Sequence, residues 1–377
     1  MATEGMLGQF VSLQRGQSYH SALLGLPGPM LLGLGTIERN GGFKGSKLKT
    51  YGGETSDKIL LTPGDLYVSL KDVTHSADLL GAVARVPAEV PLGRLTQDTI
   101  RLNIENDSVD SAFLYYTLHA PAYRAYCRVH STGTTNLDLS QKDFLSYRFW
   151  VPGRSEQRAI AEVLGALDDK IAANTKLATT IEELVGAVFV SLEPSTAGDV
   201  FLGDLLSFEY GKPLPAEIRV PGAVKVIGSG GAVGVHDTPI VADSGVVVGR
   251  KGTAGAVHWV DGPHWPIDTT YFVEPKGPDV SSEYAFFALR GLGLKELNSD
   301  SAVPGLNRNE AMAIRRPFHS GLVRRKFTET ARPMITLSSQ ISRESQQLAE
   351  LRDTLLPQLM SGALRVRDAE TIVSEAV

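Results

Sequence analysis

The sequence predicts an α+β fold in which two tandem β-rich domains are each followed by a long helix, and the two helices pack as an antiparallel coiled coil. Three observations predict this fold: a long internal repeat, a hydrophobic period that changes from strand-like to helix-like within each copy, and a linker-like segment between the copies. The chain has 377 residues, which is long enough for two or three domains.

The internal repeat is the most informative feature of the sequence. Residues 7–17 resemble residues 202–212, at an offset of 202 − 7 = 195. Residues 139–143 match residues 306–310, at an offset of 306 − 139 = 167. The falling offset indicates that the second copy is shorter. Residues 193–198 have the composition of a linker between the copies.

Short runs rich in β-branched residues lie between glycines in the first part of each copy. They occupy residues 65–70, 223–227, 245–249 and 270–273. Runs of this length that are bounded by turn residues are typical of strands. Both domains are therefore expected to be mixed or mainly β.

Each copy ends in a segment with helical periodicity. Apolar residues recur at spacings of three and four over residues 156–190, which predicts one long amphipathic helix with Ser155 as its N-cap. A second helix is predicted from about Pro333, at its first helical position, to Met360, with Pro357 at a kink or near the end. After Val366 the chain is polar, and we expect this tail to fray.

Composition excludes several classes of protein. The single cysteine, Cys127, allows no intrachain disulfide and supplies too few thiolates for a structural zinc site, which fits a reducing, cytoplasmic setting. No stretch approaches eighteen apolar residues, so a membrane-spanning segment is not expected. Lys and Arg number 37 against 42 Asp and Glu, so any DNA-binding face must be a local patch.

No catalytic or metal-binding motif is present in the sequence. The glycine-rich stretches do not supply the Gly-x4-Gly-Lys-Ser/Thr pattern of a phosphate-binding loop. The Asn/Asp-Pro-Pro-Tyr/Phe motif of amino-group methyltransferases and the His-Glu-x2-His metal motif are also absent. We therefore expect no catalytic residue and no metal ligand in this chain.

One basic loop is a candidate for nucleic-acid contact. Arg250, Lys251, Gly252 and Thr253 follow an apolar strand directly, and flanking glycines would let cations and backbone approach a phosphate or a base edge. A hairpin turn that happens to be basic is an equally weighted alternative. Residues 64–71 resemble residues 244–251 as a strand that ends in a basic loop, which adds Ser69 and Lys71 as candidates in the first copy.

The helical segments carry a resemblance to a known family. The run Trp150-Val151-Pro152-x3-Glu156-Gln157-x2-Ile160, continued to Phe189, resembles the central conserved region of the specificity (S) subunit of type I restriction-modification enzymes. The run from Leu348 through Leu351-Arg352-Asp353 to Gly362 resembles the distal conserved region of that subunit. The Arg250 loop with Trp265-Pro266-Ile267-Asp268, and Gly133-Thr134-Thr135, resemble stretches of its target recognition domains. The second copy departs from the first in having Gly321-Leu322-Val323-Arg324 where the first has Glu156-Gln157.

The resemblance implies a non-catalytic subunit with two target recognition domains, each reading one half of a bipartite site in double-stranded DNA. The helices would dock two methyltransferase (M) subunits, which bind S-adenosylmethionine and methylate adenine, and restriction/translocase (R) subunits would use ATP and Mg. This chain would bind no cofactor and no membrane.

The resemblance also implies domain boundaries and contact residues. The segments are residues 1–152 for target recognition domain 1, 153–192 for the central helix, 193–198 for the linker, 199–318 for target recognition domain 2, 319–366 for the distal helix and 367–377 for a flexible tail. The DNA-binding candidates are Ser69, Lys71, Thr134, Thr135, Arg250, Lys251, Gly252, Thr253 and Asn307. The partner-binding candidates on the helices are Glu156, Gln157, Leu167, Ile171, Asn174, Leu184, Leu348, Leu351 and Leu355.

Two alternatives stay open at this point. The chain could be the specificity subunit of another multisubunit DNA-methylation or phage-defence system with the same architecture. More remotely, it could be an enzyme with an unrecognised active site between its two β-rich domains. Adjacent genes for an adenine methyltransferase and a helicase-nuclease would favour the type I reading.

Overall fold

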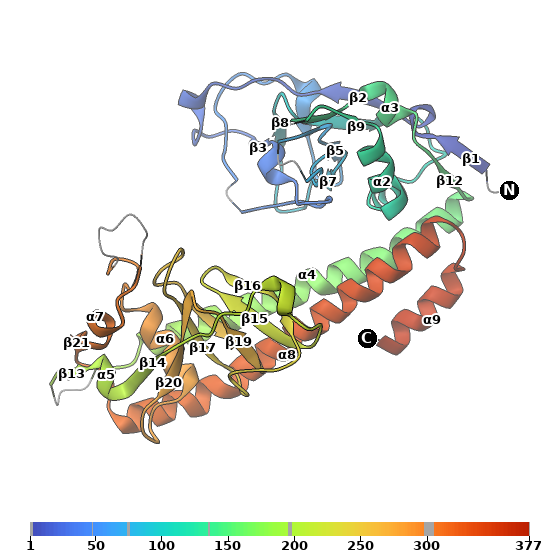
Figure 1. Cartoon of the computed structure of the whole chain (residues 1–377). Helices are drawn as coiled ribbons and strands as arrows, with labels where there is room; N and C mark the ends of the chain where they lie inside the picture. The colour runs from blue at the N-terminus through green and yellow to red at the C-terminus, as the bar shows by residue number, and fades with distance from the viewer. Residues whose placement is uncertain are drawn as a thin grey trace. The chain divides into compact units, whose positions relative to one another are not determined.

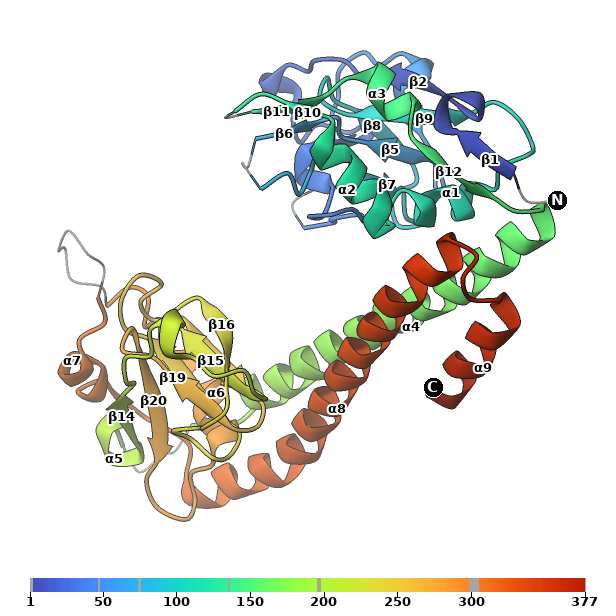
Figure 2. The ribbon, with the colours of Figure 1, turned by 45° about the vertical axis from the view of Figure 1, so that its right-hand side comes forward.

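The computed structural model describes residues 3–46, 48–73, 76–134, 136–194, 198–297 and 305–376 (Figure 1). The chain divides into two compact units, of which the first contains Met1–Ile171 and Gln346–Val377 and the second contains Ala172–Ser345. Each unit contains one β-rich domain and a part of both long helices, as the ribbon seen from a second direction also shows (Figure 2).

The β-rich domain of the first unit is built from small sheets. A four-stranded antiparallel sheet has the order β2 (Val11–Arg15), β9 (Ile100–Ile104), β5 (Leu66–Val68) and β7 (Val83–Arg85). A three-stranded sheet has the order β3 (Met30–Leu32), β8 (Gly93–Leu95) and β4 (Leu60–Leu61), and β3 runs parallel to β8. The remaining strands pair as β1 (Thr3–Met6) with β12 (Arg148–Val151), and as β10 (Ser131–Thr132), β11 (Leu137–Leu139) and β6 (Lys71–Asp72). The short helices are α1 (Ser111–Thr117), α2 (Pro121–Val129) and α3 (Gln141–Leu145).

The β-rich domain of the second unit repeats this plan. Its four-stranded sheet has the order β14 (Leu206–Tyr210), β20 (Thr270–Pro275), β17 (Gly245–Gly249) and β18 (Val257–Val260). Its three-stranded sheet has the order β16 (Gly231–His236), β15 (Val224–Gly228) and β19 (His264–Pro266), again with one parallel pair, β15 with β19. The other elements are β13 (Val200–Phe201), β21 (Arg315–Arg316), α5 (Leu202–Leu205), α6 (Ser282–Arg290) and α7 (Arg308–Met312). In the four-stranded sheets, the internal repeat of the sequence is therefore also a repeat of strand order.

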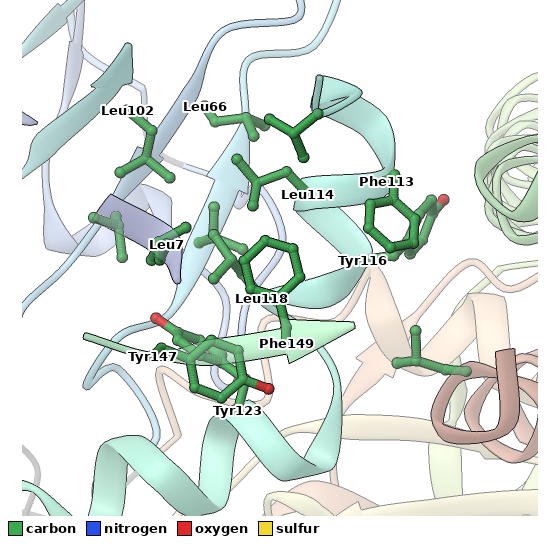
Figure 3. Packing of buried hydrophobic residues seen from close by; sticks show 14 of the residues in the cluster. Leu7, Leu66, Leu102, Phe113, Leu114, Tyr116, Leu118, Tyr123, Tyr147 and Phe149 are labelled. Carbon is green, nitrogen blue, oxygen red and sulfur yellow. The ribbon is translucent and has the colours of Figure 1, made fainter. Parts of the chain in front are cut away.

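The hydrophobic core of the first unit joins its sheet to its helices. Leu66 and Leu102 of the sheet, Phe113 and Leu114 of α1, and the aromatic rings of Tyr123, Tyr147 and Phe149 belong to one cluster (Figure 3). The rings of Tyr123 and Tyr147 meet edge to face with centroids 5.0 Å apart, an arrangement that aromatic pairs prefer.

The two long helices are α4 (Arg154–Val190) and α8 (Gly321–Met360). In the first unit, Leu164 and Leu167 from the early part of α4 share a core cluster with Leu355 and Leu359 from the end of α8. In the second unit, Ile181 and Val185 from the late part of α4 share a cluster with Phe327 and Ile341 of α8. The helices therefore run antiparallel, and the predicted α+β fold with an antiparallel helix pair is confirmed.

The starts of both helices differ from the sequence predictions. Helix α4 begins at Arg154, so Ser155 lies inside the helix instead of capping it. Helix α8 begins at Gly321, which is 333 − 321 = 12 residues before Pro333, so the prediction of Pro333 at the first helical position was wrong. Phe327 and Ala331 are buried in the core of the second unit, and this packing stabilises the early turns in spite of the proline.

The predicted flexible tail was also wrong, because residues Val366–Ala376 form a helix, α9. Gly362 has a φ of +71°, and Leu364 donates its N–H to the carbonyl of Gln358 at 3.1 Å, so the chain reverses after α8. Ala369 is fully buried, and Val366 and Val373 pack against the core of the first unit. The tail is polar in composition, but its few apolar residues fall on one face. Of the predicted linker, residues 195–197 lie outside the described residues.

Candidate nucleic-acid interface

The basic loop of the second unit follows strand β17 and is closed by backbone hydrogen bonds. The N–H of Gly249 donates to the carbonyl of Ala256, and the N–H of Gly255 donates back to the carbonyl of Gly249, both at 2.8 Å. Gly252 and Gly255 have φ values of +78° and +76°, in the left-handed region that favours glycine. The loop therefore has a defined backbone conformation.

The side chain of Arg250 lies on an aromatic floor made by β14 and β20. Its guanidinium carbon is 4.9 Å from the ring centroid of Tyr210 and 6.0 Å from that of Tyr271. Its Nη1 donates to the carbonyl of Asp268 at 3.1 Å. Stacking and this hydrogen bond fix the plane of the guanidinium, which is the geometry that favours bidentate recognition.

A second arginine shares this floor. Arg308, in the first turn of α7, has its guanidinium carbon 5.6 Å from the Tyr210 ring and pairs with Glu209 at 3.3 Å. The Tyr210 ring is about half exposed. Sequence reasoning did not select Tyr210 or Arg308, although both fall in segments of the internal repeat.

The other candidates of the second unit lie next to Arg250. Lys251 is exposed and forms an antiparallel bridge with Gly305, and the N–H of Leu306 donates to the carbonyl of Arg250 at 2.9 Å. These bonds bring Asn307 beside the loop, where its side chain caps α7 by accepting from the N–H of Asn309 at 2.8 Å. Gly252 and Thr253 form the exposed end of the loop.

The corresponding loop of the first unit has a different character. The N–H of Leu139 donates to the carbonyl of Leu70 at 2.8 Å, so Leu70 stands where the second unit has Arg250. Ser69 is fully buried, and its hydroxyl donates to the carbonyl of Lys71 at 2.6 Å, so this side chain supports the turn and does not reach the surface. The Nζ atom of Lys71 lies 3.7 Å from Oδ1 of Asp98 and forms an ion pair with it. Thr134 is exposed, and Thr135 lies outside the described residues.

Most of the candidate partner-binding residues on the helices are occupied within the chain. The amide of Gln157 is fully buried, accepts from the N–H of Asp110 at 2.7 Å and donates to the carbonyls of Ser108 and Pro152, both at 2.9 Å. Leu167, Leu348 and Leu355 are buried in the core, and Ile171 and Leu351 pack against it. Asn174 is buried against α8. Glu156 and Leu184 are exposed, and Leu184 presents 52% of its surface.

A polar network that the sequence did not reveal ties three elements of the first unit together. The carboxylate of Asp168 on α4 accepts from the hydroxyl of Tyr116 on α1 and from Nη1 of Arg352 on α8, both at 2.7 Å. Burial raises the pKa of Tyr116, and the adjacent carboxylate raises it further. The network is structural, because its groups satisfy one another.

Among the described residues, no three His, Cys, Asp or Glu side chains come together in a way that could hold a metal ion. Within the same part of the chain, no helix combines the length and the apolar character that a membrane crossing requires.

Comparison with known proteins finds one family model that matches part of this chain. The family model described as type I restriction modification DNA specificity domain matches residues 40–183. No curated protein matches the chain. Among solved structures, the chain is similar to the S subunit of a type I restriction-modification system from M. genitalium, with 20% identity, 96% of each chain covered and a TM-score of 0.65.

Two further structures match at lower similarity. One is described by complex assembly and conformational transition of the type I R-M system, with 12% identity, coverage of 96% of this chain and 98% of that chain, and a TM-score of 0.44. The other is the HsdS subunit from Thermoanaerobacter tengcongensis, with 13% identity, coverage of 96% and 97%, and a TM-score of 0.36. Residues 40–183 thus match the model of the type I restriction modification DNA specificity domain, and the chain has a fold similar to that of the S subunit from M. genitalium.

Proposed function

We propose that this chain is the sequence-specific DNA-recognition subunit of a type I restriction-modification complex and reads a bipartite site in double-stranded DNA. The observation that carries the proposal is the Arg250 guanidinium, stacked on Tyr210 at the foot of an exposed basic loop. The repeat of strand order supplies a second domain of the same plan, which supports a site with two halves.

The loop offers two different kinds of DNA contact. Arg250 has a fixed guanidinium plane, which suits a bidentate contact with the O6 and N7 atoms of a guanine. Lys251 is a flexible point charge, which suits a phosphate. The glycines leave the backbone uncovered and let a DNA strand approach closely. The loop of the first unit has Leu70 in place of Arg250, so we infer that the two half-sites are read by different contacts.

The subunit would act by binding and would leave the chemistry to its partners. Exposed leucines on both long helices of the second unit, Leu177, Leu184 and Leu337, support docking of other proteins. We propose two methyltransferase (M) subunits, which would carry S-adenosylmethionine and methylate adenine, and restriction/translocase (R) subunits, which would carry ATP and Mg. Such a complex would work on DNA in the cytoplasm.

A test of the function maps methylated adenines in the host genome with and without this gene. The expected result is a bipartite motif that is methylated only when the gene is present. A genome whose methylation is unchanged by the deletion would contradict the proposal.

A test of the loop measures DNA affinity of the assembled complex on cognate and unrelated duplexes over a range of salt. Arg250→Ala should cost about 1–3 kcal/mol on the cognate duplex and much less on the unrelated one, because a base contact is lost. Lys251→Ala should weaken both alike and lower the salt slope by about 1, because a phosphate contact is lost. Lys326→Ala, which removes an exposed charge from α8, serves as the control. Equal losses in all three variants would assign the effect to net charge.

A further inference from the structure

The middle of the helix pair in the second unit is polar. The side chain of Asn174 on α4 is only 6% exposed, and its Nδ2 donates to Oε2 of Glu344 on α8 at 2.9 Å. The hydroxyl of Ser338 on α8 lies 3.5 Å from the carbonyl of Ala178 on α4. A hollow of about 350 Å³ borders these residues and is lined by threonine and serine side chains.

Around this polar patch, the two helices of the second unit meet through apolar side chains, and the other polar contact described between the helices, Asp168 with Arg352, lies in the first unit. Ile181, Val185, Phe327 and Ile341 lie in the core cluster of the second unit. Apolar contacts are not directional, and the same face of a coiled coil returns every seven residues, so such contacts alone tolerate a shift of one helix along the other. The small side chains around Ala178 and Ser338 add little resistance to sliding.

A buried amide and its half-buried carboxylate partner do resist a shift. Both groups need a hydrogen-bond partner, and only one register supplies it without a penalty. A shift of α8 by seven residues would place Leu337 or Leu351 at the position of Glu344, since 344 − 7 = 337 and 344 + 7 = 351. Either leucine would leave Asn174 without a partner in the interface and would remove Glu344 from it.

We propose that Asn174 and Glu344 are positioning residues that set the register of α4 against α8. The sequence placed Asn174 among the residues that bind a partner subunit, but its amide is turned into the chain. Register matters for the recognition domains because the end of α8 packs into the core of the first unit through Leu355 and Leu359. The effect of this register on DNA recognition rests on the proposed function, whereas its effect on helix packing does not.

The test uses cysteine pairs that report the register of the full chain. Ala178→Cys with Ser338→Cys lies at a contact of the native register. The second pair is Ala178→Cys with Ala331→Cys. Position 331 lies seven residues before position 338 on α8, which is about 10.5 Å at 1.5 Å per residue, so a disulfide cannot form between these positions in the native register. Cys127 can stay in place, because its thiol is buried.

The deciding variant replaces both polar partners, as Asn174→Leu with Glu344→Leu. It should fold at least as stably as the parent chain, because a buried amide and its half-buried carboxylate partner are replaced by two apolar side chains. The shifted cross-link between positions 178 and 331 should rise at least tenfold relative to the native one. Glu344→Gln, which keeps a hydrogen-bond acceptor, and Lys176→Leu, which adds a leucine to an exposed position of α4, should both give the native cross-link alone.

Two results would overturn the proposal. One is a double variant that folds and forms the native cross-link alone; the other is a double variant that unfolds, which would make the pair a source of stability instead of register. Methylation mapping adds the DNA consequence: the double variant should accept additional spacer lengths with unchanged half-sites. If the parent chain directs no methylation, the proposed function fails while the cross-linking result stands.

Discussion

Gly81 and Gly255 occupy the same position in the two β-rich domains. The N–H of Gly81 donates to the carbonyl of Ser69 at 2.7 Å, and the N–H of Gly255 donates to the carbonyl of Gly249 at 2.8 Å. Their φ values are +69° and +76°. Each glycine closes the connection that leaves the central strand of its sheet, although the intervening loops have different lengths.

Gly255 is the first site at which this closure can be tested. A Cβ atom on Gly255 would lie 2.5 Å from the carbonyl carbon of Leu294, whereas a Cβ on Gly262, at a φ of +77°, would meet nothing within 4 Å. Both substitutions to alanine carry the left-handed backbone cost of about 1–2 kcal/mol. Gly255→Ala should lose about 3 kcal/mol or more in the free energy of unfolding, because the backbone of residue 294 must also move.

Denaturant unfolding of both variants measures the difference. Gly262→Ala isolates the cost of the backbone conformation, because it has the same φ and open space. Equal losses in the two variants would mean that the loop relaxes around the new methyl group.

The internal repeat predicted the architecture because both copies have the same hydrophobic periodicity. This periodicity determines which segments fold as strands and which fold as helices. The helices at residues 154–190 and 321–360 follow from the same period, and only their starts were misplaced. The equivalence of Gly81 with Gly255 was not predicted, because a loop of 80 − 69 = 11 residues in one copy corresponds to one of 254 − 249 = 5 in the other. Because the loops differ in length, equivalent residues on either side of them are separated by different sequence offsets.

The candidate site was predicted only in part. Residues 250–253 and Asn307 do lie together, because the loop after β17 and the segment before α7 are joined by the hydrogen bond from the N–H of Leu306 to the carbonyl of Arg250. The burial of Ser69 was not predicted, since a serine after a strand has the same sequence pattern in a surface turn. Tyr210 and Arg308 were missed because ring stacking between distant segments leaves no local signal in the sequence.

His119 should make the stability of the first unit depend on pH. Its Nδ1 lies 2.8 Å from the carbonyl of Tyr115, its ring centroid is 4.2 Å from that of Tyr115, and its Nε2 faces the backbone of Gly41. Burial lowers the pKa of His119 to about 4. The folded chain therefore binds the proton less tightly than the unfolded chain.

The direction in which the free energy of unfolding changes with pH follows from this difference in pKa. The contribution of His119 is fully present above the ordinary histidine pKa of about 6.5 and is lost as the pH falls through about 4 in the folded chain. Between pH 7 and pH 4, His119→Gln should flatten the fall in the free energy of unfolding by about 2 kcal/mol.

Urea unfolding at several pH values checks this prediction. His130→Gln is the matched control, because His130 makes the same kind of contact with Tyr126, at 2.9 Å from Nδ1 to the carbonyl. A similar flattening in both variants would assign the effect to the loss of any histidine and not to the burial of His119.

Helix α9 should be held to the first unit by one buried face. Ala369 is fully buried, whereas Ile372, three residues further along the same helix, is 39% exposed. Ala369→Asp would place an unpaired carboxylate in the core and should cost about 2 kcal/mol or more, or else release α9 from the unit. Ile372→Asp should change stability by about 0.5 kcal/mol or less, because its side chain can remain in water.

Limited proteolysis distinguishes the two ways in which Ala369→Asp can act. A released helix would be cut rapidly after Gly362, where the chain reverses, while the β-rich domain would stay resistant. A docked helix with a strained core would instead lower the thermal midpoint without faster cleavage. An Ala369→Asp chain with the cleavage rate and the thermal midpoint of the parent would show that α9 contributes nothing to the unit, and the tail would then behave as its polar composition suggests.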